Sequence, residues 1–209
     1  MPATPEEQLQ RLLDGRTFED QTFSNLALSS RALEGKEFFH CRFEHCVGQE
    51  SQWRDCLLED AEFRSCDLTR AGWKQVGLRG VRFVGSKLMG IFWSSVSPLP
   101  EVSFDECNLR YATFERLNLR KTPFLKSVLR EANLLECDLS DADFSGSDLS
   151  GSTIRGCTLA RADFSSATNV FIDPAQNRVK DAHVSTEAAV AVAEQLGFVV
   201  GTAPPRRKK

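Results

Sequence analysis

A period of five residues runs through most of this chain and constrains its fold more than any other feature. Steps of five from Phe18 to Trp93, and again from Phe104 to Phe164, place a large apolar residue at 28 of 29 positions, with Gly48 as the exception. Neither the 3.6-residue period of an amphipathic helix nor the alternation of a strand produces this spacing. The chain therefore contains a repeat whose units are too short to bury their apolar faces alone, so that stacking supplies the core.

The residues around each large position predict how the repeat turns. Two residues before it the chain carries a small residue such as Cys66 or Ala71, and one residue before it Asp or Asn recurs, as at Asp67 and Asn108. Asp and Asn side chains stabilise turns by bonding to nearby backbone. We therefore expect a corner every five residues and four sides to a coil, with coils stacked about 4.8 Å apart. About seven such coils would make a rod of about 35 Å.

Residues twenty apart should then lie above one another on the same side of the coil. Trp53, Trp73 and Trp93, the three tryptophans of the chain, have this spacing on one side. The neighbouring side carries a ladder of phenylalanines with a one-residue slip in its middle: Phe23, Phe43, Phe63, Phe83, Phe104, Phe124, Phe144 and Phe164. Aromatic side chains bury a large area each, so the ladders predict an all-β solenoid with an aromatic interior.

The segment FFHCRFEHC, residues 38–46, raises the question of a metal site, because His and Cys close together bind zinc. In the five-residue frame Cys41 and Cys46 occupy the small inward position, as the other five cysteines do, whereas His40 and His45 fall at the outward corner. The two residue types then lie on opposite sides of the wall and cannot share an ion. We therefore predict no metal and no cofactor.

Stacked cysteines raise a separate question. Cys46 and Cys66 are one coil apart, as are Cys137 and Cys157, and one strand spacing is close to the distance that a disulfide spans. The polar N-terminus shows no secretory signal, and seven cysteines are an odd number. Both points favour reduced thiols and a cytoplasmic protein. We expect no membrane span, since no apolar run approaches the roughly 20 residues that one needs.

Helices are predicted at both ends of the repeat. TPEEQLQRLLDG predicts a short helix with Thr4 as its N-cap, Pro5 at its first position and Gly15 after its end. VSTEAAVAVAEQLGF predicts a second helix, capped by Ser185 or Thr186 and ending near Gly197. Such helices would cover the open edges of a solenoid. We expect a helical cap over residues 1–16, a repeat region over 17–168, a C-terminal cap over 169–202 and a disordered basic tail over 203–209.

The second helix leaves an apolar end exposed, at Leu196, Phe198, Val199 and Val200. These side chains can fold over the last coil or pack against a second copy of the chain. Of the two, the sequence favours a two-fold homodimer through the C-terminal segment.

The repeat is interrupted once, over residues 94–103. This segment, SSVSPLPEVS, contains two prolines and shifts the phase by one residue, so the wall must bulge there. It is either a tolerated insertion or a recognition loop, since loops on rigid scaffolds often carry binding contacts. The candidate partner-binding residues of the loop are Ser97, Pro98, Leu99, Pro100 and Glu101.

The sequence lacks the motifs of an enzyme. It has no glycine-rich phosphate loop, no nucleophile elbow and no spaced set of metal ligands, and His183 has no candidate partner nearby. The net charge of −3 predicts no strong attraction to nucleic acid or to anionic membranes. We therefore expect a binding surface without catalytic residues.

Several segments resemble the pentapeptide-repeat family, whose pattern is a small residue, Asp or Asn, Leu or Phe, and two variable residues. The clearest are CDLTRAGWKQ, CNLRYATFER and ANLLECDLSDADFSGSDLSGSTIRGCTLARADFSS. The resemblance implies a right-handed quadrilateral β-helix, a hand that crossover connections also favour.

A narrower resemblance concerns the tail IDPAQNRVKDAHVSTEAAVAVAEQLGFVVG and the proline-containing break before CNLRYATF. Both are similar to the branch of the family that protects DNA gyrase, which includes microcin-immunity, plasmid quinolone-resistance and albicidin-resistance proteins. This resemblance implies a dimeric rod that binds the topoisomerase as a mimic of duplex DNA.

The acidic residues test the idea of mimicry. Between residues 131 and 148 there are six acids and no base: Glu131, Glu136, Asp138, Asp141, Asp143 and Asp148. We call these six residues the acidic belt. They fall on successive sides of the coil rather than in one stripe, and arginines dilute the acids of the first half. Since duplex DNA carries about one charge per 1.7 Å, mimicry along the whole rod is weakly supported. A mixed model fits better, in which the acidic C-terminal half and the dimer junction lie near a basic DNA-binding groove while the loop at residues 97–101 contacts the topoisomerase or disturbs a bound poison.

The hypothesis that follows is a non-enzymatic resistance or self-immunity factor. It would bind DNA gyrase, and possibly topoisomerase IV, without contacting nucleic acid directly, and would relieve the action of a gyrase poison. The alternative is a structural interaction module with a different partner.

Overall fold

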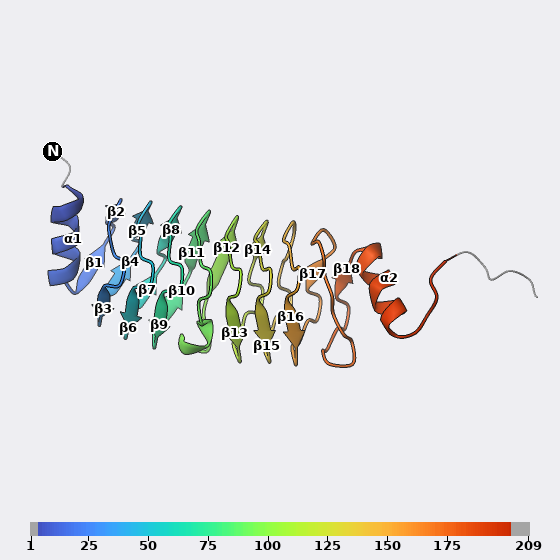
Figure 1. Ribbon diagram of the computed structural model, residues 1–209. Helices are drawn as coiled ribbons and strands as arrows, with labels where there is room; N and C mark the ends of the chain where they lie inside the picture. The colour runs from blue at the N-terminus through green and yellow to red at the C-terminus, as the bar shows by residue number, and fades with distance from the viewer. Residues whose placement is uncertain (1–3, 202–209) are drawn as a thin grey trace, which may run out of the picture.

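The computed structural model describes residues 4–201, which form a straight rod of stacked coils with a helix at each end (Figure 1). The basic tail predicted over residues 203–209, and residue 202 of the predicted C-terminal cap, lie outside the described residues. Every strand pairing is parallel and joins residues 20 or 21 apart. The predicted all-β solenoid is therefore confirmed.

Helix α1, Pro5–Asp14, begins and ends as its sequence predicts. Thr4 Oγ1 accepts a hydrogen bond from the Glu7 amide, and the Glu7 carboxylate accepts one from the Thr4 amide, which makes a complete capping box. At the other end, the buried Lys36 donates from Nζ to the carbonyl oxygens of Leu13 and Gly15, at 2.9 and 2.6 Å. The ammonium group thus satisfies carbonyls at the helix C-terminus and ties α1 to the second coil.

Each coil has four sides, and the strands of successive coils stack along them into four walls. The walls are numbered 1 to 4 in chain order around the coil. Wall 1 contains β1 Thr17–Glu19, β4 Glu37–Phe39, β7 Leu57–Glu59 and β10 Gly77–Arg79. Wall 2 contains β2 Thr22–Ser24, β5 Arg42–Glu44, β8 Glu62–Arg64, β11 Val81–Val84, β12 Val102–Asp105 and β14 Phe124–Leu125, and β17 Asp163–Phe164 and β18 His183–Val184 extend it.

Wall 4 contains β3 Ala32–Glu34, β6 Gln52–Arg54 and β9 Gly72–Lys74, then the 3₁₀ turn Trp93–Ser95, and then β13 Thr113–Glu115, β15 Asn133–Leu135 and β16 Thr153–Arg155. Wall 3 has no regular strand within residues 4–201 and is held by single parallel bridges, from Ala27 with Val47 through to Asp148 with Thr168. The same kind of bridge continues wall 1 beyond residue 118.

The interior is built from the predicted aromatic ladders. Along wall 2 successive phenylalanine rings stack with centroids 4.4 to 5.5 Å apart: Phe23, Phe43, Phe63, Phe83, Phe104, Phe124, Phe144 and Phe164. Trp53, Trp73 and Trp93 stack on wall 4 and meet the phenylalanines edge to face. The eight phenylalanines mark about eight coils, close to the about seven predicted from the length of the repeat.

Each corner uses a residue in the left-handed conformation, two residues after the large inward side chain. Asp20 and His40 are examples, both with φ of 52°. The amide of such a residue donates to a carbonyl of the next coil, as from Asp20 to Phe39 at 3.0 Å. This bond offsets part of the strain of a positive φ. Because the corner recurs every fifth residue, the four-sided section predicted from the sequence is confirmed.

The Asp and Asn residues before the large position form the predicted turns. Asp138 Oδ1 accepts from the Ser140 amide at 3.0 Å, and Asp148 Oδ1 accepts from the Ser150 amide at 3.0 Å. Asp67, Asn108, Asn118, Asp143 and Asp163 make the same bond two residues along the chain.

The predicted phase slip is also present. Phe63 pairs with Phe83 twenty residues later, whereas Phe83 pairs with Phe104 after 21. The one extra residue lies between Trp93 and Val102, so the phenylalanine ladder continues in register on both sides of it.

Helix α2, Thr186–Gln195, closes the other end of the rod. Ser185 is its N-cap and accepts from the Ala188 amide, and Gly197 follows with φ of +88°. Ala188 is the buried residue of this helix. Figure 1 shows α2 standing beside the last turn rather than lying across the rod as α1 does.

Candidate functional site

The cysteines and histidines of residues 38–46 point to opposite sides of the wall, as predicted. Cys41 and Cys46 are buried, and their Sγ atoms approach the carbonyl oxygens of Phe18 and Phe23 in the coil before. His40 and His45 occupy exposed corners. A shared Cys and His metal site is therefore excluded by geometry.

All seven cysteines are buried free thiols. Burial raises the pKa of the Cys41 and Cys56 thiols and raises the pKa of Cys107 to about 12. In the stacked pairs, the neighbouring thiol and burial together raise the pKa of Cys66 and Cys137. Because a reactive cysteine must be accessible as its thiolate and all seven side chains are buried, the cysteines serve as small core residues.

The loop at residues 97–101 leaves the wall as a short, anchored excursion. The Ser97 amide donates to the Val76 carbonyl at 3.0 Å, which is the regular bond of wall 1. The chain then departs, and the ladder resumes where the Glu101 amide donates to Leu78 and the Glu101 carbonyl accepts from Val81. Between these points Leu99 is 67% exposed, while Pro100 is buried. The loop therefore exposes the apolar side chain of Leu99, while hydrogen bonds hold both ends of the loop in the wall.

A shallow groove of about 330 Å³ lies beside the loop. Pro100 and Glu101 form one side, and Arg82, Arg120 and Lys121 contribute basic groups. Arg82 pairs with Glu62 at 2.7 Å, and Arg120 pairs with Asp141 at 3.2 Å. Leu99 and this groove together offer an apolar contact next to exposed positive charge.

The acidic belt is not a bare anionic surface, because stacking places arginines from neighbouring coils against it. Glu136 pairs with Arg116 at 2.9 Å, and Asp141 pairs with Arg161 at 2.6 Å. The remaining pairs are Glu131 with Arg110 at 3.9 Å, Asp138 with Arg120 at 3.6 Å and Asp148 with Arg130 at 2.6 Å. Asp143 has no ion pair within residues 4–201, and its Oδ1 accepts from the Ser145 amide at 2.8 Å.

These contacts lower the pKa values of Asp138, Asp141 and Asp148. Burial alone would raise the pKa of Asp138, but bonds from Ser140 and the charge of Arg120 outweigh it and lower that pKa. The pKa of Asp148 is lowered in the same way, by Ser150, Arg130 and Asn169 against the effect of burial. Arg161 lowers the pKa of the half-buried Asp141. Most of the negative charge of the acidic belt is therefore paired with arginines of neighbouring coils.

The apolar C-terminal residues named from the sequence are all exposed. Leu196, Phe198 and Val200 are about half exposed or more, and Val199 is 98% exposed. Phe171 and Val184, which sequence reasoning missed, are exposed near them. An apolar groove of about 250 Å³ runs between the last turn and α2, lined by Ile172, Pro174, Val179, Ala182, Val184, Ala189 and Val192. This end of the rod therefore has a continuous apolar surface.

Two further exposed aromatic residues lie at mid-rod and were not predicted. Phe92 and Tyr111 are both about half exposed. Phe92 bridges to Thr113, two residues after Tyr111, and the Arg110 guanidinium lies 5.3 Å from the Tyr111 ring centroid. Phe92 lies one residue before the inward Trp93, at a position where most repeats carry a small or polar residue. A large aromatic residue at that outward position is the sequence signal that could have revealed this exposed pair.

Neither of the helices in residues 4–201 has the length and apolar character needed to cross a membrane.

The family profile described as Pentapeptide repeat region matches residues 16–93 and 97–164. No curated protein matches the chain by sequence. Among solved structures, a trypsin-treated QnrB1 variant, described as a plasmid-mediated fluoroquinolone resistance protein, is 26% identical, with a TM-score of 0.46, over 90% of this chain and 92% of that one. Full-length QnrB1 is 24% identical, with a TM-score of 0.46, over 87% and 90%.

A third similar structure is HetL from the cyanobacterium Nostoc, a pentapeptide repeat protein involved in the regulation of heterocyst differentiation. It is 18% identical, with a TM-score of 0.37, over 85% of this chain and 93% of that one.

Proposed function

Because the chain belongs to the pentapeptide repeat family, we propose that it acts by stoichiometric binding to a protein partner, and that this partner is DNA gyrase. In this proposal the protein protects gyrase from a poison and serves in antibiotic resistance or self-immunity. The likeness of its tail and proline loop to the gyrase-protecting branch supports the choice of partner. The proposal places the protein in the cytoplasm, where gyrase acts on DNA.

The observation that carries the proposal is the loop at residues 97–101. A regular rod repeats similar side chains on every coil, whereas the loop departs from the wall and exposes Leu99 beside a groove with basic side chains. Its two ends are hydrogen-bonded into the ladder at Val76 and Leu78. A loop held in this way loses little conformational entropy when it binds, which favours its use as a contact.

The pairing of the acidic belt favours loop contacts over imitation of DNA. A mimic needs unpaired negative charge at a density close to that of duplex DNA, about one charge per 1.7 Å. Five of the six belt acids have an arginine partner within 4.0 Å. In this proposal the acidic belt therefore contributes less to binding than the loop does, and Asp143 and the other belt acids face a basic region of the partner.

The apolar C-terminal surface supports a homodimer. Val199 and Phe198 lie exposed next to the groove between α2 and the last turn. Exposed apolar patches of this kind mark interaction sites, and a two-fold dimer would cover the same patch on both copies. The measurement is the molar mass by light scattering. Val199→Asp and Phe198→Asp should each give monomers, whereas the loop variant Leu99→Glu should stay dimeric.

The function is tested by a supercoiling assay with purified gyrase and a quinolone or peptide poison, into which the full chain is titrated. Protection should saturate near one protein dimer per gyrase, as expected for binding rather than turnover. If micromolar protein gives neither protection nor detectable gyrase binding, the proposal fails. Topoisomerase IV in the same assay shows whether protection extends to it.

The loop is tested by a matched pair of variants. Leu99→Glu places a charge on the loop, and Val47→Glu places the same charge on a similarly exposed apolar side chain three coils away. We expect Leu99→Glu to abolish protection while circular dichroism and the melting temperature stay unchanged, because the Leu99 side chain is exposed. Val47→Glu should protect as the native chain does. Equal loss in both variants would refute a specific role of the loop.

Phe92 and Tyr111 support a second candidate, an interaction module with a different protein partner. Exposed aromatic and arginine side chains are typical of binding hot spots, and Arg110 lies against Tyr111. If gyrase binding is absent, Phe92→Ala and Tyr111→Ala are the variants to compare in a search for that partner.

A further inference from the structure

The corner between walls 1 and 2 carries an unusual ladder in the first three coils. Asp20, His40 and Asp60 occupy equivalent positions, with φ of 52°, 52° and 51°. The pairing of Phe18 with Phe38, and of Phe38 with Leu58, fixes these corners directly above one another. The three side chains therefore leave the backbone in the same direction, one coil apart.

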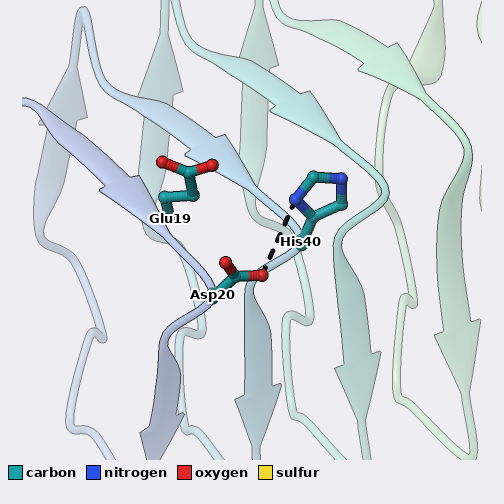
Figure 2. A group of neighbouring side chains, drawn as sticks. All are labelled: Glu19, Asp20 and His40. Carbon is teal, nitrogen blue, oxygen red and sulfur yellow. Dashed lines mark ion pairs between the residues drawn. The ribbon is translucent and has the colours of Figure 1, made fainter.

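The imidazole of His40 stands between two carboxylates. Its Nδ1 lies 3.7 Å from Asp20 Oδ1, and its Nε2 lies 3.7 Å from Asp60 Oδ2. Glu19, on β1, brings a third carboxylate to the Asp20 side, and ligand atoms of Glu19, Asp20 and His40 all lie within 4.8 Å of one another. Figure 2 shows the Asp20 carboxylate beneath the ring and the Glu19 carboxylate on the same side of the wall.

Other corners of the rod pair an acid with a permanent cation. Glu50 stacks with Arg70 at 2.7 Å, and Asp141 stacks with Arg161 at 2.6 Å. In the ladder around His40 the stacked group is an imidazole, which carries a lone pair for a metal when it is neutral. Within the described chain, Glu19 has no ion-pair partner and Asp20 has His40 alone. The negative charge here is thus left for a cation from solution.

We propose that Glu19, Asp20 and His40 form a binding site for a divalent transition-metal ion such as Zn²⁺. Two carboxylate oxygens and one imidazole nitrogen suit Zn²⁺, at ligand distances of about 2.0–2.2 Å. A tetrahedral ion at such distances holds its ligand atoms about 3.4 Å from one another. Small rotations of these exposed side chains bring atoms that lie within 4.8 Å of each other to that separation. Water fills the remaining positions. The imidazole makes Mg²⁺ and Ca²⁺ poor occupants, because these ions prefer ligand sets made of oxygen.

Asp60 completes the arrangement from the other side of the ring. If Nδ1 binds the ion, Nε2 carries the proton and faces Asp60 Oδ2. Metal-binding histidines usually donate their second N–H to a carboxylate, which fixes the tautomer and strengthens the ligand. Asp60 is therefore assigned as the positioning residue of the site. Ligands from two coils also make the bound ion a link between β1 and β4.

The chain contains its own control. His45 occupies the next corner of the same coil, with φ of 53°, and is exposed as His40 is. Its neighbours in the corner ladder are Asn25 and Ser65 rather than two aspartates. Asn25 also shows that asparagine is accepted at such a corner, so His→Asn substitutions preserve the left-handed backbone.

The experiment is isothermal titration of Zn²⁺ into the full chain, compared with His40→Asn and His45→Asn. One ion should bind per chain, and His40→Asn should weaken binding by at least about tenfold, as expected for loss of a ligand. His45→Asn should stay within about twofold, the usual range of surface substitutions. Asp60→Asn should weaken binding less than His40→Asn, since Asp60 does not touch the ion.

A second readout locates the ion. Amide resonances of residues 19–20 and 39–41 should shift on addition of Zn²⁺ and stay unshifted in His40→Asn. Absence of saturable binding by the native chain, or equal loss in His40→Asn and His45→Asn, would overturn the proposal. The gyrase proposal does not depend on either result.

Discussion

The coils before the loop and the coils after it form one continuous rod but are held together differently. The first half fills its interior with the stacked indoles of Trp53, Trp73 and Trp93, packed against phenylalanines. The second half has Leu134 and Ile154 at the matching positions on wall 4. Strands on walls 1 and 2 also give way to single bridges there. Two kinds of local chemistry thus produce the same coil.

The position before the large residue explains this difference. In the second half it is mostly Asp or Asn, whose side chain bonds to the amide two residues on, as from Asp138 to Ser140. That bond closes a turn and competes with extended backbone. In the first half the same position carries Thr22, Ala32 or Gln52, which leave the backbone extended. The first half therefore relies more on stacked indoles, and the second on turns closed by Asp and Asn side chains, while ion pairs between coils occur in both.

The largest effect should come from emptying the aromatic interior. Trp73→Ala removes a ring that stacks on Trp53 and Trp93 and meets Phe63 and Phe83 edge to face. We expect a loss of about 3–5 kcal/mol in the free energy of unfolding, typical of a buried tryptophan truncated to alanine. Urea denaturation measures it, and a loss under about 1 kcal/mol would show that the first half does not depend on its indoles.

A smaller loss is expected from opening one turn of the second half. Asp148→Ala removes bonds to the Ser150 amide, Arg130 and Asn169. We expect a loss of about 1–3 kcal/mol, because bonds to a charged acceptor are lost. Arg42→Ala alters the corresponding position of the first half, where alanine already occurs at Ala32, and should cost less than about 0.5 kcal/mol. Similar losses in the two variants would remove the contrast between the halves.

Acid should loosen the second half before the first. The pKa values of Asp138, Asp148 and Asp163 are lowered in the folded chain, whereas in the first half Asp67 shows this shift. A lowered folded pKa stabilises the fold above the unfolded value, near about 3.9. That stability is lost as the pH falls through the folded pKa. Hydrogen exchange at pH 6 and pH 3 should show amides of residues 133–168 losing protection first, and uniform loss would contradict this.

The smallest expected effect on stability concerns the hydrogen bonding of the indole N–H groups. Trp53 Nε1 donates to Ser51 Oγ at 3.0 Å, but Trp73 Nε1 has no partner in the described part of the chain. Ala71 stands where Ser51 stands one coil earlier. Ala71→Ser should supply the missing acceptor and stabilise the fold by about 0.5–1.5 kcal/mol, the net value of one hydrogen bond. Ala61→Ser, at a buried alanine with no indole two residues on, is the control and should destabilise.

The period of five predicted the coil, its register and the phase slip, and the capping residues predicted both helices, because each depends on residue type at a fixed spacing. It also placed the cysteines inside and His40 and His45 outside. It did not reveal that Arg116 and Arg161 pair with acids of the belt, because these pairs form between neighbouring coils and not between residues close in sequence. Set in rows of twenty, the sequence places Arg116 beside Glu136 and Arg161 beside Asp141.

Other features depend on side-chain conformation and could not be found from spacing. Lys36 stands at a position where most repeats have a small residue, and only the path of its side chain to Leu13 and Gly15 shows that it caps α1. The grouping of Glu19 with His40 likewise depends on how two exposed side chains turn from the wall.

We propose above all that a rigid rod presents the loop at residues 97–101 to gyrase. Hydrogen exchange of the full chain, alone and with purified gyrase, is the decisive measurement. We expect new protection at residues 97–101 and at the adjoining residues 80–82 and 120–122, with little change on the first two coils. Protection confined to the acidic belt, or no protection at saturating gyrase, would contradict it.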